Sequence, residues 1–296
     1  MSSKVFLVTG SARGLGRHIT EAALAAGNRV VATARTPSQL DDLVATYGDH
    51  ILPFALDVTD PAAAERAVRA AVDTFGRLDV VVNNAGYANL ASVEDITIDD
   101  FRAQVDTNLF GVVNVTKAAL PVLREQGDGH IVNVSSVGGR LTTPGLSAYQ
   151  AAKWAVGGFS EALAQEVTGL GIKVTVIEPG GMDTDWAGSS MSIPLISTPY
   201  APSVGAVAEL FGAMTGGAAS DPAKVARVVV QLADLDEPPL RLLLGSDAVM
   251  YAGNAEQARV EADARWRALS VSTDRDGITA EQVDPIGSTS VRTATT

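Results

Sequence analysis

The sequence contains no cysteine among its 296 residues and only three histidines. The absence of cysteine excludes disulfide bonds and thiolate chemistry, and it fits a reducing compartment. His18, His50 and His130 lie far apart in the chain and show no spacing typical of metal ligands. We therefore expect no metal site, and surface or structural roles for the three histidines.

Positive charge is also scarce. The chain has 22 lysines and arginines against 34 aspartates and glutamates, which gives a net charge of −12 and a pI near 4.6. Such a surface repels phosphate backbones, so no nucleic acid partner is expected. An anionic ligand would need basic residues of its own at its binding site.

Long apolar runs are missing as well. The first run, residues 5–8, is shorter than the apolar part of a secretion signal, and no run reaches the length of a membrane span. We expect a cytoplasmic protein with no membrane partner. Hydrophobic residues nevertheless make up 46% of the chain, which is enough for a folded protein with a large core.

Apolar, β-branched segments alternate with segments of helical pattern along most of the chain. Strands are expected at residues 4–9, 29–34, 51–56, 78–82, 130–134, 172–177 and, as a seventh, 240–244. Helical segments lie between them. This alternation predicts an α/β fold, a Rossmann-type doubly wound parallel sheet of about seven strands in three layers.

A glycine-rich turn joins the first strand to the first helix. Gly10 permits the tight turn, Gly14 lets the backbone approach a pyrophosphate, and Gly16 lets helix and strand pack closely. Free N–H groups at the start of the helix would receive the phosphates. An ordinary glycine-rich loop is the alternative, but the strand–turn–helix setting favours a dinucleotide site.

The end of the second strand carries Arg35, with no acidic residue beside it. In dinucleotide-binding folds an acid at this place binds the ribose hydroxyl of NAD, whereas an arginine accommodates the 2′-phosphate of NADP. Arg13, in the glycine turn, is placed to reach the same phosphate. The pair favours NADP (as NADPH), with NAD as the less favoured cofactor.

Polar or small residues follow the other expected strands where each one ends. Asp57, Asn84, Ser136 and Pro179 all fall at the carboxyl edge of the predicted sheet, where such folds bind ligands. Asn108 lies inside a helical stretch expected at about 98–125, which is a locally unfavourable place for asparagine.

The segment 147–153 places Tyr149 and Lys153 four residues apart on one helix face. The reference pKa of a phenol is about 10, and a nearby cation lowers it. The two side chains form a usable acid/base pair, although any helix can carry the same pair without a function.

Two segments depart from the alternating pattern. Residues 182–217 are rich in serine, proline and glycine and predict an irregular substrate lid. From about residue 271 the chain is polar and aperiodic, which predicts a disordered tail over 271–296. The expected organisation is one NADP-binding catalytic domain over residues 1–270, followed by that tail.

Taken together, these motifs resemble the short-chain dehydrogenase/reductase family, in its compact single-domain branch. The matching residues stand in the order Thr9-Gly10-xxx-Gly14-x-Gly16, Asp57-Val58, Asn83-Asn84-Ala85-Gly86, Asn108, Ser136, Tyr149-xxx-Lys153 and Pro179-Gly180-xxx-Thr184. Ser136 is chosen over Ser135 because the family's serine usually lies thirteen positions before the tyrosine.

The resemblance implies an NADP(H)-dependent oxidoreductase that interconverts a ketone or aldehyde and an alcohol. Tyr149 would exchange the proton, Lys153 would lower the pKa of Tyr149 and bind the nicotinamide ribose, and Ser136 would polarise the substrate oxygen. Asn108 would hold a water behind Lys153. A homodimer or homotetramer is expected from the family's habit.

The resemblance also implies the binding residues. The cofactor would contact Gly10, Ser11, Arg13, Gly14, Leu15, Gly16, Arg35, Asp57, Val58, Asn84, Ala85, Gly86, Tyr149, Lys153, Pro179, Gly180, Met182 and Thr184. The substrate would contact Ser136, Leu141, Thr143, Leu146, Tyr149, Trp186 and Met191. These substrate residues are mainly apolar, so a largely apolar carbonyl compound or alcohol is expected.

Two other functions fit parts of the pattern. A non-catalytic NADP-binding regulator would typically lack the tyrosine or the lysine, and this chain has both. A sugar-nucleotide epimerase or dehydratase shares the Tyr–Lys pair but usually has another glycine spacing and a larger C-terminal domain.

Overall fold

The structure is a computed structural model that describes residues 3–182, 191–213 and 218–284. The chain divides into two compact units, Met1–Ala252 and Gly253–Thr296. The first unit contains the whole sheet and every described residue of the candidate site.

Seven parallel strands form one sheet in the order β3-β2-β1-β4-β5-β6-β7. Their bounds are β1 Val5–Val8, β2 Arg29–Ala34, β3 Ile51–Ala55, β4 Val80–Asn83, β5 Gly129–Val134, β6 Ile172–Pro179 and β7 Arg241–Leu244. Phe6 of β1 pairs with Val30 on one side and Val80 on the other. The predicted doubly wound sheet and its seven strands are confirmed.

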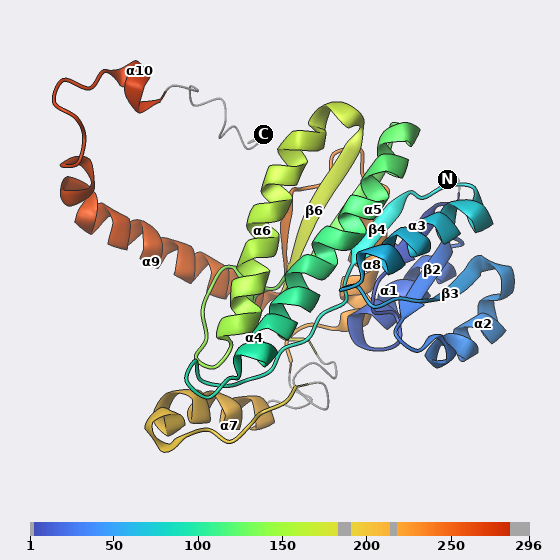
Figure 1. Cartoon of the computed structure of the whole chain (residues 1–296), viewed down its shortest axis with the longest axis horizontal. Coiled ribbons are helices and arrows are strands. Elements are labelled where there is room, and N and C mark those ends of the chain that lie inside the picture. The colour runs from blue at the N-terminus through green and yellow to red at the C-terminus, as the bar shows by residue number, and fades with distance from the viewer. Residues whose placement is uncertain (1–2, 183–190, 214–217, 285–296) are drawn as a thin grey trace. The chain divides into compact units, whose positions relative to one another are not determined.

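Helices α1 to α8 lie between the strands in sequence, and α9 and α10 follow β7 (Figure 1). Their bounds are α1 Gly14–Ala25, α2 Asp41–Tyr47, α3 Pro61–Phe75, α4 Ile98–Val105, α5 Gly111–Gln126, α6 Ser147–Val167, α7 Ala206–Ala213, α8 Pro222–Leu232, α9 Ser246–Val271 and α10 Ala280–Val283. Local signals fix several ends. Asp60 and Asp221 cap α3 and α8 through their side chains, each followed by proline at the first helical position.

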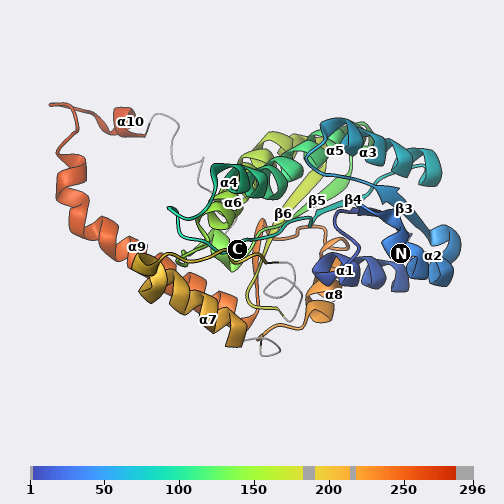
Figure 2. The same ribbon diagram turned by 60° about the horizontal axis from the view of Figure 1, so that its bottom comes forward.

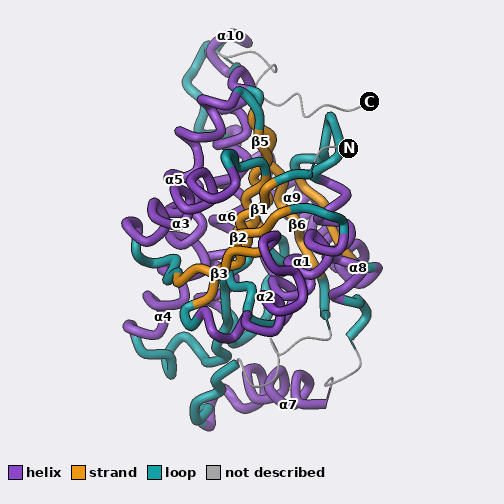
Figure 3. Tube along the Cα trace, turned by 90° about the vertical axis from the view of Figure 1, so that its right-hand side faces the viewer, coloured by secondary structure: helices purple, strands orange, loops and turns teal. Residues whose placement is uncertain are grey.

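Buried apolar side chains form a core on each face of the sheet. Helices α1, α2 and α8 cover one face, and α3, α5 and α6 cover the other (Figure 3). Ile19 and Val229 represent the first cluster, and Val68 and Leu123 the second. Because both faces are covered, β1 is apolar throughout and the first three residues of β4 are valines, as is typical of buried parallel strands.

The expected helix over 98–125 is interrupted. A π-helical turn, Asp106–Phe110, separates α4 from α5 and contains the buried Asn108. Such turns insert an extra residue into an α-helix and are frequent at functional sites. Here the turn explains how asparagine is accommodated in a helical stretch.

Residues 191–213 of the predicted lid contain regular turns and a helix, which an irregular segment would lack. Its described part contains a 3₁₀ turn, Thr198–Tyr200, a π turn, Ala201–Gly205, and the apolar helix α7. In Figures 1 and 2, α7 lies beyond the end of the sheet at which α6 begins. In the predicted tail, the structure describes the short helix α10, which Thr279 and Gln282 cap reciprocally.

His130 of β5 is buried, and its contacts indicate a structural role. Its Nε2 lies 2.9 Å from Thr175 Oγ1, and Thr175 donates its hydroxyl hydrogen to Pro239 O at 2.8 Å. His130 Nε2–H must therefore be the donor to Thr175. Nδ1 has no hydrogen-bond partner in the described part of the chain. Burial, together with the charges of Lys173 and Lys4, lowers the pKa of His130 to about 4.

This lowered pKa predicts an acid-sensitive contribution to stability. The folded protein favours neutral His130, so its contribution is complete above the unfolded pKa of about 6.5 and is lost as pH falls toward 4. A His130→Gln variant keeps a donor near Thr175 but does not titrate. Between about pH 7 and about pH 5, the wild type should lose ~2 kcal/mol more unfolding free energy than the variant. Urea unfolding at both pH values measures this, and equal losses would disprove it.

Membrane-spanning helices and metal clusters are both absent from residues 3–182, 191–213 and 218–284. No described helix is long and apolar enough to cross a membrane. Within the same ranges, no three histidine, aspartate or glutamate side chains gather in a way that suits a metal ion.

Candidate active site

The strand order reverses between β1 and β4, which are neighbours in the sheet although their sequence positions are far apart. Such a switch point leaves a crevice at the carboxyl ends of the strands, where doubly wound folds bind ligands. The glycine turn after β1 and the Asn84 turn after β4 meet there.

The glycine turn has the backbone that its residues predict. Gly10 and Gly14 adopt positive φ angles of 71° and 57°, which only glycine adopts readily. A Cβ on Gly16 would collide with the carbonyl oxygen of Gly10 and the side chain of Asn84. Arg13, the residue before α1, makes no side-chain cap, so the first N–H groups of α1 stay available to an anionic ligand.

Other residues of this turn are structural supports. Ser11 is buried and donates through Oγ to Val8 O at 2.9 Å, while Leu15 packs into the core. Thr9, which sequence reasoning did not place in the site, accepts hydrogen bonds from Asn84 N and Ala85 N, each at 2.9 Å. Asn84 Nδ2 returns a bond to Thr9 O at 2.9 Å. The two turns are thereby fixed to each other.

Two arginines stand exposed near this crevice. Neither Arg13 nor Arg35 forms an ion pair within the described residues, whereas the nearby Arg17 is paired with Glu21 and Asp42. The charge of Arg35 contributes to lowering the pKa of Asp57, after the larger effect of the Thr59 hydrogen bonds. Arg35 therefore lies at the ends of β2 and β3, where the sequence predicted it.

Val58 follows Asp57 and is buried beneath the start of α5. A Cβ on Gly111 would strike its side chain, and Asn114 Nδ2 donates to Val58 O at 3.0 Å. These contacts hold the end of β3 at the edge of the crevice.

The three expected catalytic side chains of β5 and α6 come together. Tyr149 and Lys153 are both buried in α6, and Lys153 Nζ lies 5.7 Å from the centre of the Tyr149 ring. Ser136, two residues after β5, lies near enough to Tyr149 for its hydroxyl to lower the pKa of the phenol. Lys153 Nζ donates to Val134 O at 2.8 Å. A phenol, a hydroxyl and an ammonium thus share one site, which suits proton transfer to or from an oxygen.

Burial shifts the pKa values of the buried tyrosine and lysine in opposite directions. It raises the pKa of Tyr149 to about 12, and the Ser136 hydrogen bond opposes the rise. The lowering of this pKa by Lys153, implied by the resemblance, stays a prediction. Burial also lowers the pKa of Lys153 to about 8. The phenol keeps its proton near neutral pH and is prepared to act as an acid.

The side chain of Asn108 is held by hydrogen bonds to the segment after β4 and to α4. Its Nδ2 donates to Tyr87 O and Gln104 O, each at 2.8 Å, and its Oδ1 accepts from Tyr87 N at 3.2 Å. A Cβ on Gly86 would strike this Oδ1. The side chain of Asn108 therefore fixes the chain after β4. Its role in holding a water stays a prediction.

The turn after β6 is held by a residue that the sequence did not reveal. Gly181 N donates to Asp247 Oδ2 at 2.7 Å, and a Cβ on Gly180 would collide with the same carboxylate. Pro179 ends β6, and Met182 forms an isolated bridge with Ser220. Asp247 lies far from this turn in the sequence, and no sequence motif predicts the contact between them. Thr184 and Trp186 lie outside the described residues.

An apolar cluster surrounds the buried face of Tyr149. The predicted Leu146 and Met191 belong to it, together with Ala88, Leu90, Ile196, Tyr200, Val204, Val207, Ala208 and Phe211. The predicted Leu141 and Thr143 are engaged through their backbones, with Trp154 Nε1 and Gln150 Oε1 respectively. Sequence reasoning missed Leu90, Val204 and Phe211, because ordinary apolar residues of loops and lids carry no motif.

The lid is joined to the loop after β4 by polar contacts. Ser192 N donates to Asn89 Oδ1 at 3.0 Å, Ser197 N to Asp95 Oδ2 at 3.1 Å, and Tyr200 Oη to Glu94 Oε2 at 2.8 Å. The described part of the lid thus packs over the same end of the molecule as Tyr149.

A doubly wound sheet with a glycine turn at its switch point and a Tyr–Lys–Ser group at the same edge defines a dinucleotide-dependent oxidoreductase fold. The family model for short chain dehydrogenases matches residues 4–192. The chain belongs to the short-chain dehydrogenase/reductase family, and the predicted resemblance is confirmed.

Known relatives cover nearly the whole chain. Oxidoreductase BOA17 of Botryotinia fuckeliana is 56% identical over 272 residues, which are 92% of this chain and 99% of that protein. The crystal structure of a short-chain dehydrogenase from Streptomyces avermitilis has a TM-score of 0.86 and 39% identity, with 93% of this chain and 100% of that one covered. A closed form of serine dehydrogenase with NADP+ has a TM-score of 0.71 and 29% identity, with 81% and 94% covered.

Proposed function

We propose that the protein is an NADP(H)-dependent oxidoreductase that interconverts a largely apolar ketone or aldehyde and the corresponding alcohol. The observation that carries the proposal is the meeting of Tyr149, Ser136 and Lys153 beside the glycine turn at the switch point of the sheet.

The residues at the crevice fit a nicotinamide dinucleotide. The space left by Gly16 and the uncapped start of α1 suit a pyrophosphate, and Pro179 and Gly180 stand at the end of β6 for the nicotinamide half. When bound, the cofactor supplies the hydride. Solved relatives hold either NADP+ or NADH, so the choice of NADP rests on Arg13 and Arg35.

The protein's own residues manage the proton. Ser136 would donate to the substrate carbonyl oxygen and orient it toward Tyr149. The phenol would then give its proton to that oxygen as negative charge develops there, or accept it when an alcohol is oxidised. Lys153, positively charged at neutral pH, would stabilise the resulting phenolate. Positioned acid catalysis of this kind contributes ~10²–10⁴-fold to the rate.

The substrate class follows from the apolar cluster. Leu90, Leu146 and Val204 are buried around Tyr149, and the partly buried side chains of α7 extend the same surface. A carboxylate or phosphate would lose its hydration against these apolar side chains. The favoured substrate is therefore a neutral apolar carbonyl compound or alcohol.

A screen of NADPH oxidation over ketones and aldehydes tests this function. The panel should pair each neutral alkyl ketone with a keto acid of the same length, and it should include sugar phosphates. We expect the neutral member of each pair to be the better substrate by at least about tenfold in kcat/KM. Tenfold corresponds to ~1.4 kcal/mol, and burying an unpaired carboxylate costs more free energy than that. Faster turnover of the charged members would contradict the substrate class.

Two alternatives are separated by the same screen. A non-catalytic NADP-binding regulator would bind NADPH and leave every carbonyl compound unreduced. An epimerase or dehydratase would convert a sugar nucleotide with no net consumption of NADPH.

A further inference from the structure

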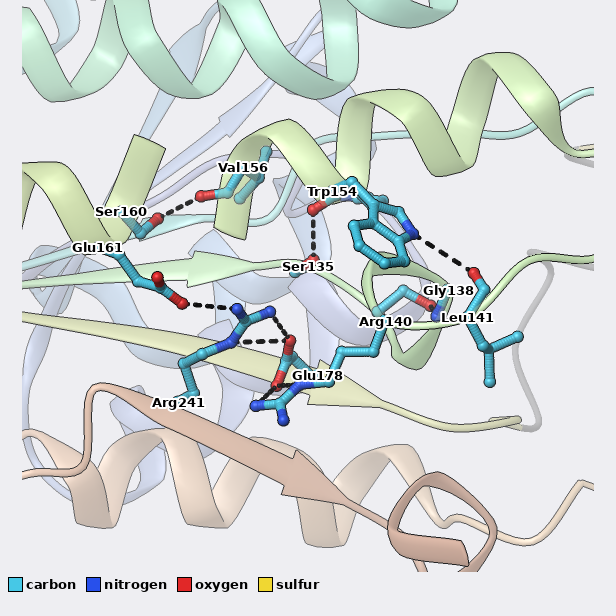
Figure 4. A network of polar contacts seen from close by, with 12 residues as sticks. Ser135, Gly138, Arg140, Leu141, Trp154, Val156, Ser160, Glu161, Glu178 and Arg241 are labelled. Atoms are coloured by element: carbon cyan, nitrogen blue, oxygen red, sulfur yellow. Dashed lines mark hydrogen bonds and ion pairs between the residues drawn. The ribbon is translucent and has the colours of Figure 1, made fainter. Parts of the chain in front are cut away.

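Glu178, the seventh residue of β6, is a fully buried carboxylate with no part in the proton path described above. Its side chain has 0% exposure. Arg140 Nε donates to one carboxylate oxygen at 2.8 Å, and Arg140 Nη2 forms an ion pair with the same oxygen at 2.7 Å. Arg241 donates through Nε and Nη2 to the other oxygen. Figure 4 shows the two guanidinium groups on either side of the carboxylate.

A fourth residue completes the network. Arg241 Nη1 donates to Glu161 Oε1 at 2.6 Å, and Glu161 lies on α6, the helix of Tyr149 and Lys153. The network therefore holds two positive and two negative side chains. Burying this many charges stabilises a fold less than apolar packing would, but removing one partner strands another at high cost. The arrangement therefore favours one geometry more than it adds stability.

The position of Arg140 in the chain shows which segment its ion pair with Glu178 holds. Arg140 follows the 3₁₀ turn Val137–Gly139, which begins directly after Ser136. On the other side of Ser136, Ser135 Oγ donates to Lys153 O at 3.0 Å. Beyond Arg140, Leu141 O accepts from Trp154 Nε1 at 3.4 Å. Ser136 thus lies on a short loop that is fastened at both ends.

Glu178 connects this loop to the nicotinamide side of the crevice. It immediately precedes Pro179 and Gly180, and its strand pairs with β5, which leads to Ser136. We propose that the Arg140–Glu178 ion pair is a positioning device, which fastens the Ser136 loop to the end of β6 and so sets the place of the Ser136 hydroxyl relative to Tyr149. The inference rests on the proposed function, because it assigns a role within that same site.

Replacement of Arg140 tests the device with the least disturbance elsewhere, since Glu178 is adjacent to the expected cofactor turn. In Arg140→Ala, the loop loses its side-chain attachment to β6 and keeps only the backbone bond from Ser135 N to Ile177 O, so the Ser136 hydroxyl shifts. A misplacement of about 1 Å typically costs ~10²-fold in rate. We expect kcat to fall about 10–100-fold while the Kd for NADPH stays within about twofold.

Two variants make this result specific. Arg140→Lys keeps a single charged contact with Glu178 and should restore part of the lost kcat. Glu161→Gln removes a network member that contacts Arg241 and is 44% exposed, and it should leave kcat unchanged. If Arg140→Ala does not fold, Arg140→Lys carries the test, with an expected kcat below that of the wild type and an unchanged Kd.

Hydrogen exchange gives a readout that does not depend on turnover. Gly138 N donates to Ser136 Oγ at 3.0 Å, and Gly139 N donates to Ser136 O at 2.8 Å. These amides should exchange faster in Arg140→Ala and at the wild-type rate in Glu161→Gln. Slow exchange and wild-type kcat in a folded Arg140→Ala would overturn the proposal. A wild type that reduces no carbonyl compound would overturn the proposed function, while the exchange result would still judge the attachment of the loop.

Discussion

A Tyr149→Phe variant should bind NADPH as the wild type does and lose turnover by ~10²–10⁴-fold. The buried phenol, with a pKa of about 12, is the proton donor that the arrangement offers to a carbonyl oxygen, and Ser136 alone cannot replace it because its hydroxyl is a far weaker acid. Steady-state kinetics give the turnover, and NADPH fluorescence gives the binding.

The matched control is Tyr47→Phe. Tyr47 is the last residue of α2, at the β3 end of the sheet, and packs against the core on the face opposite α6. The same loss of a hydroxyl there should leave turnover unchanged. Normal turnover in Tyr149→Phe would remove Tyr149 from the chemistry and with it the proposed function.

An Arg35→Ala variant should lose most of the preference for NADPH over NADH. A hydrogen bond between a guanidinium and a phosphate is worth ~1.5–3 kcal/mol, which corresponds to a rise of about 10–100-fold in the Kd for NADPH. The Kd for NADH should change little, because NADH lacks the 2′-phosphate. Titration of both cofactors into both proteins measures the ratio, and Arg13→Ala in the same background should reduce it further.

Arg17→Ala supplies the control for a general loss of positive charge. Arg17 lies on α1 close in sequence to Arg13, but Glu21 and Asp42 already neutralise it. Its removal should not change the ratio of the two Kd values. An Arg35→Ala protein with the wild-type ratio would show that the end of β2 does not select the cofactor.

The fold was predictable because its signals are local. Each parallel strand is a short run with a majority of apolar residues, and alternation with helices leaves few other topologies. The same topology brings Gly10, Ser136 and Pro179 to one edge, since each follows the carboxyl end of a strand. Tyr149 and Lys153 needed only helical spacing to share a face.

Other parts of the site were not predictable because they depend on contacts distant in sequence. Asp247 supports the Gly180 turn from 66 residues beyond its partner Gly181, and Arg241 reaches Glu178 across 63 residues. No periodic pattern in the sequence indicates contacts between residues so far apart. The raised pKa of Tyr149 likewise depends on burial by Leu90 and Val204, which the sequence presents as ordinary apolar residues.

The measurement that tests the central claim most directly is the transfer of deuterium from NADPH to product. NADPH labelled on one or the other face of the hydride-donating carbon is incubated with the ketone that the screen finds fastest, and the alcohol is analysed by mass spectrometry. We expect one of the two labelled cofactors to place one deuterium on the former carbonyl carbon, and Tyr149→Phe to do so at a rate lower by ~10²–10⁴-fold. Alcohol free of deuterium from both cofactors, or transfer at the wild-type rate by Tyr149→Phe, would contradict it.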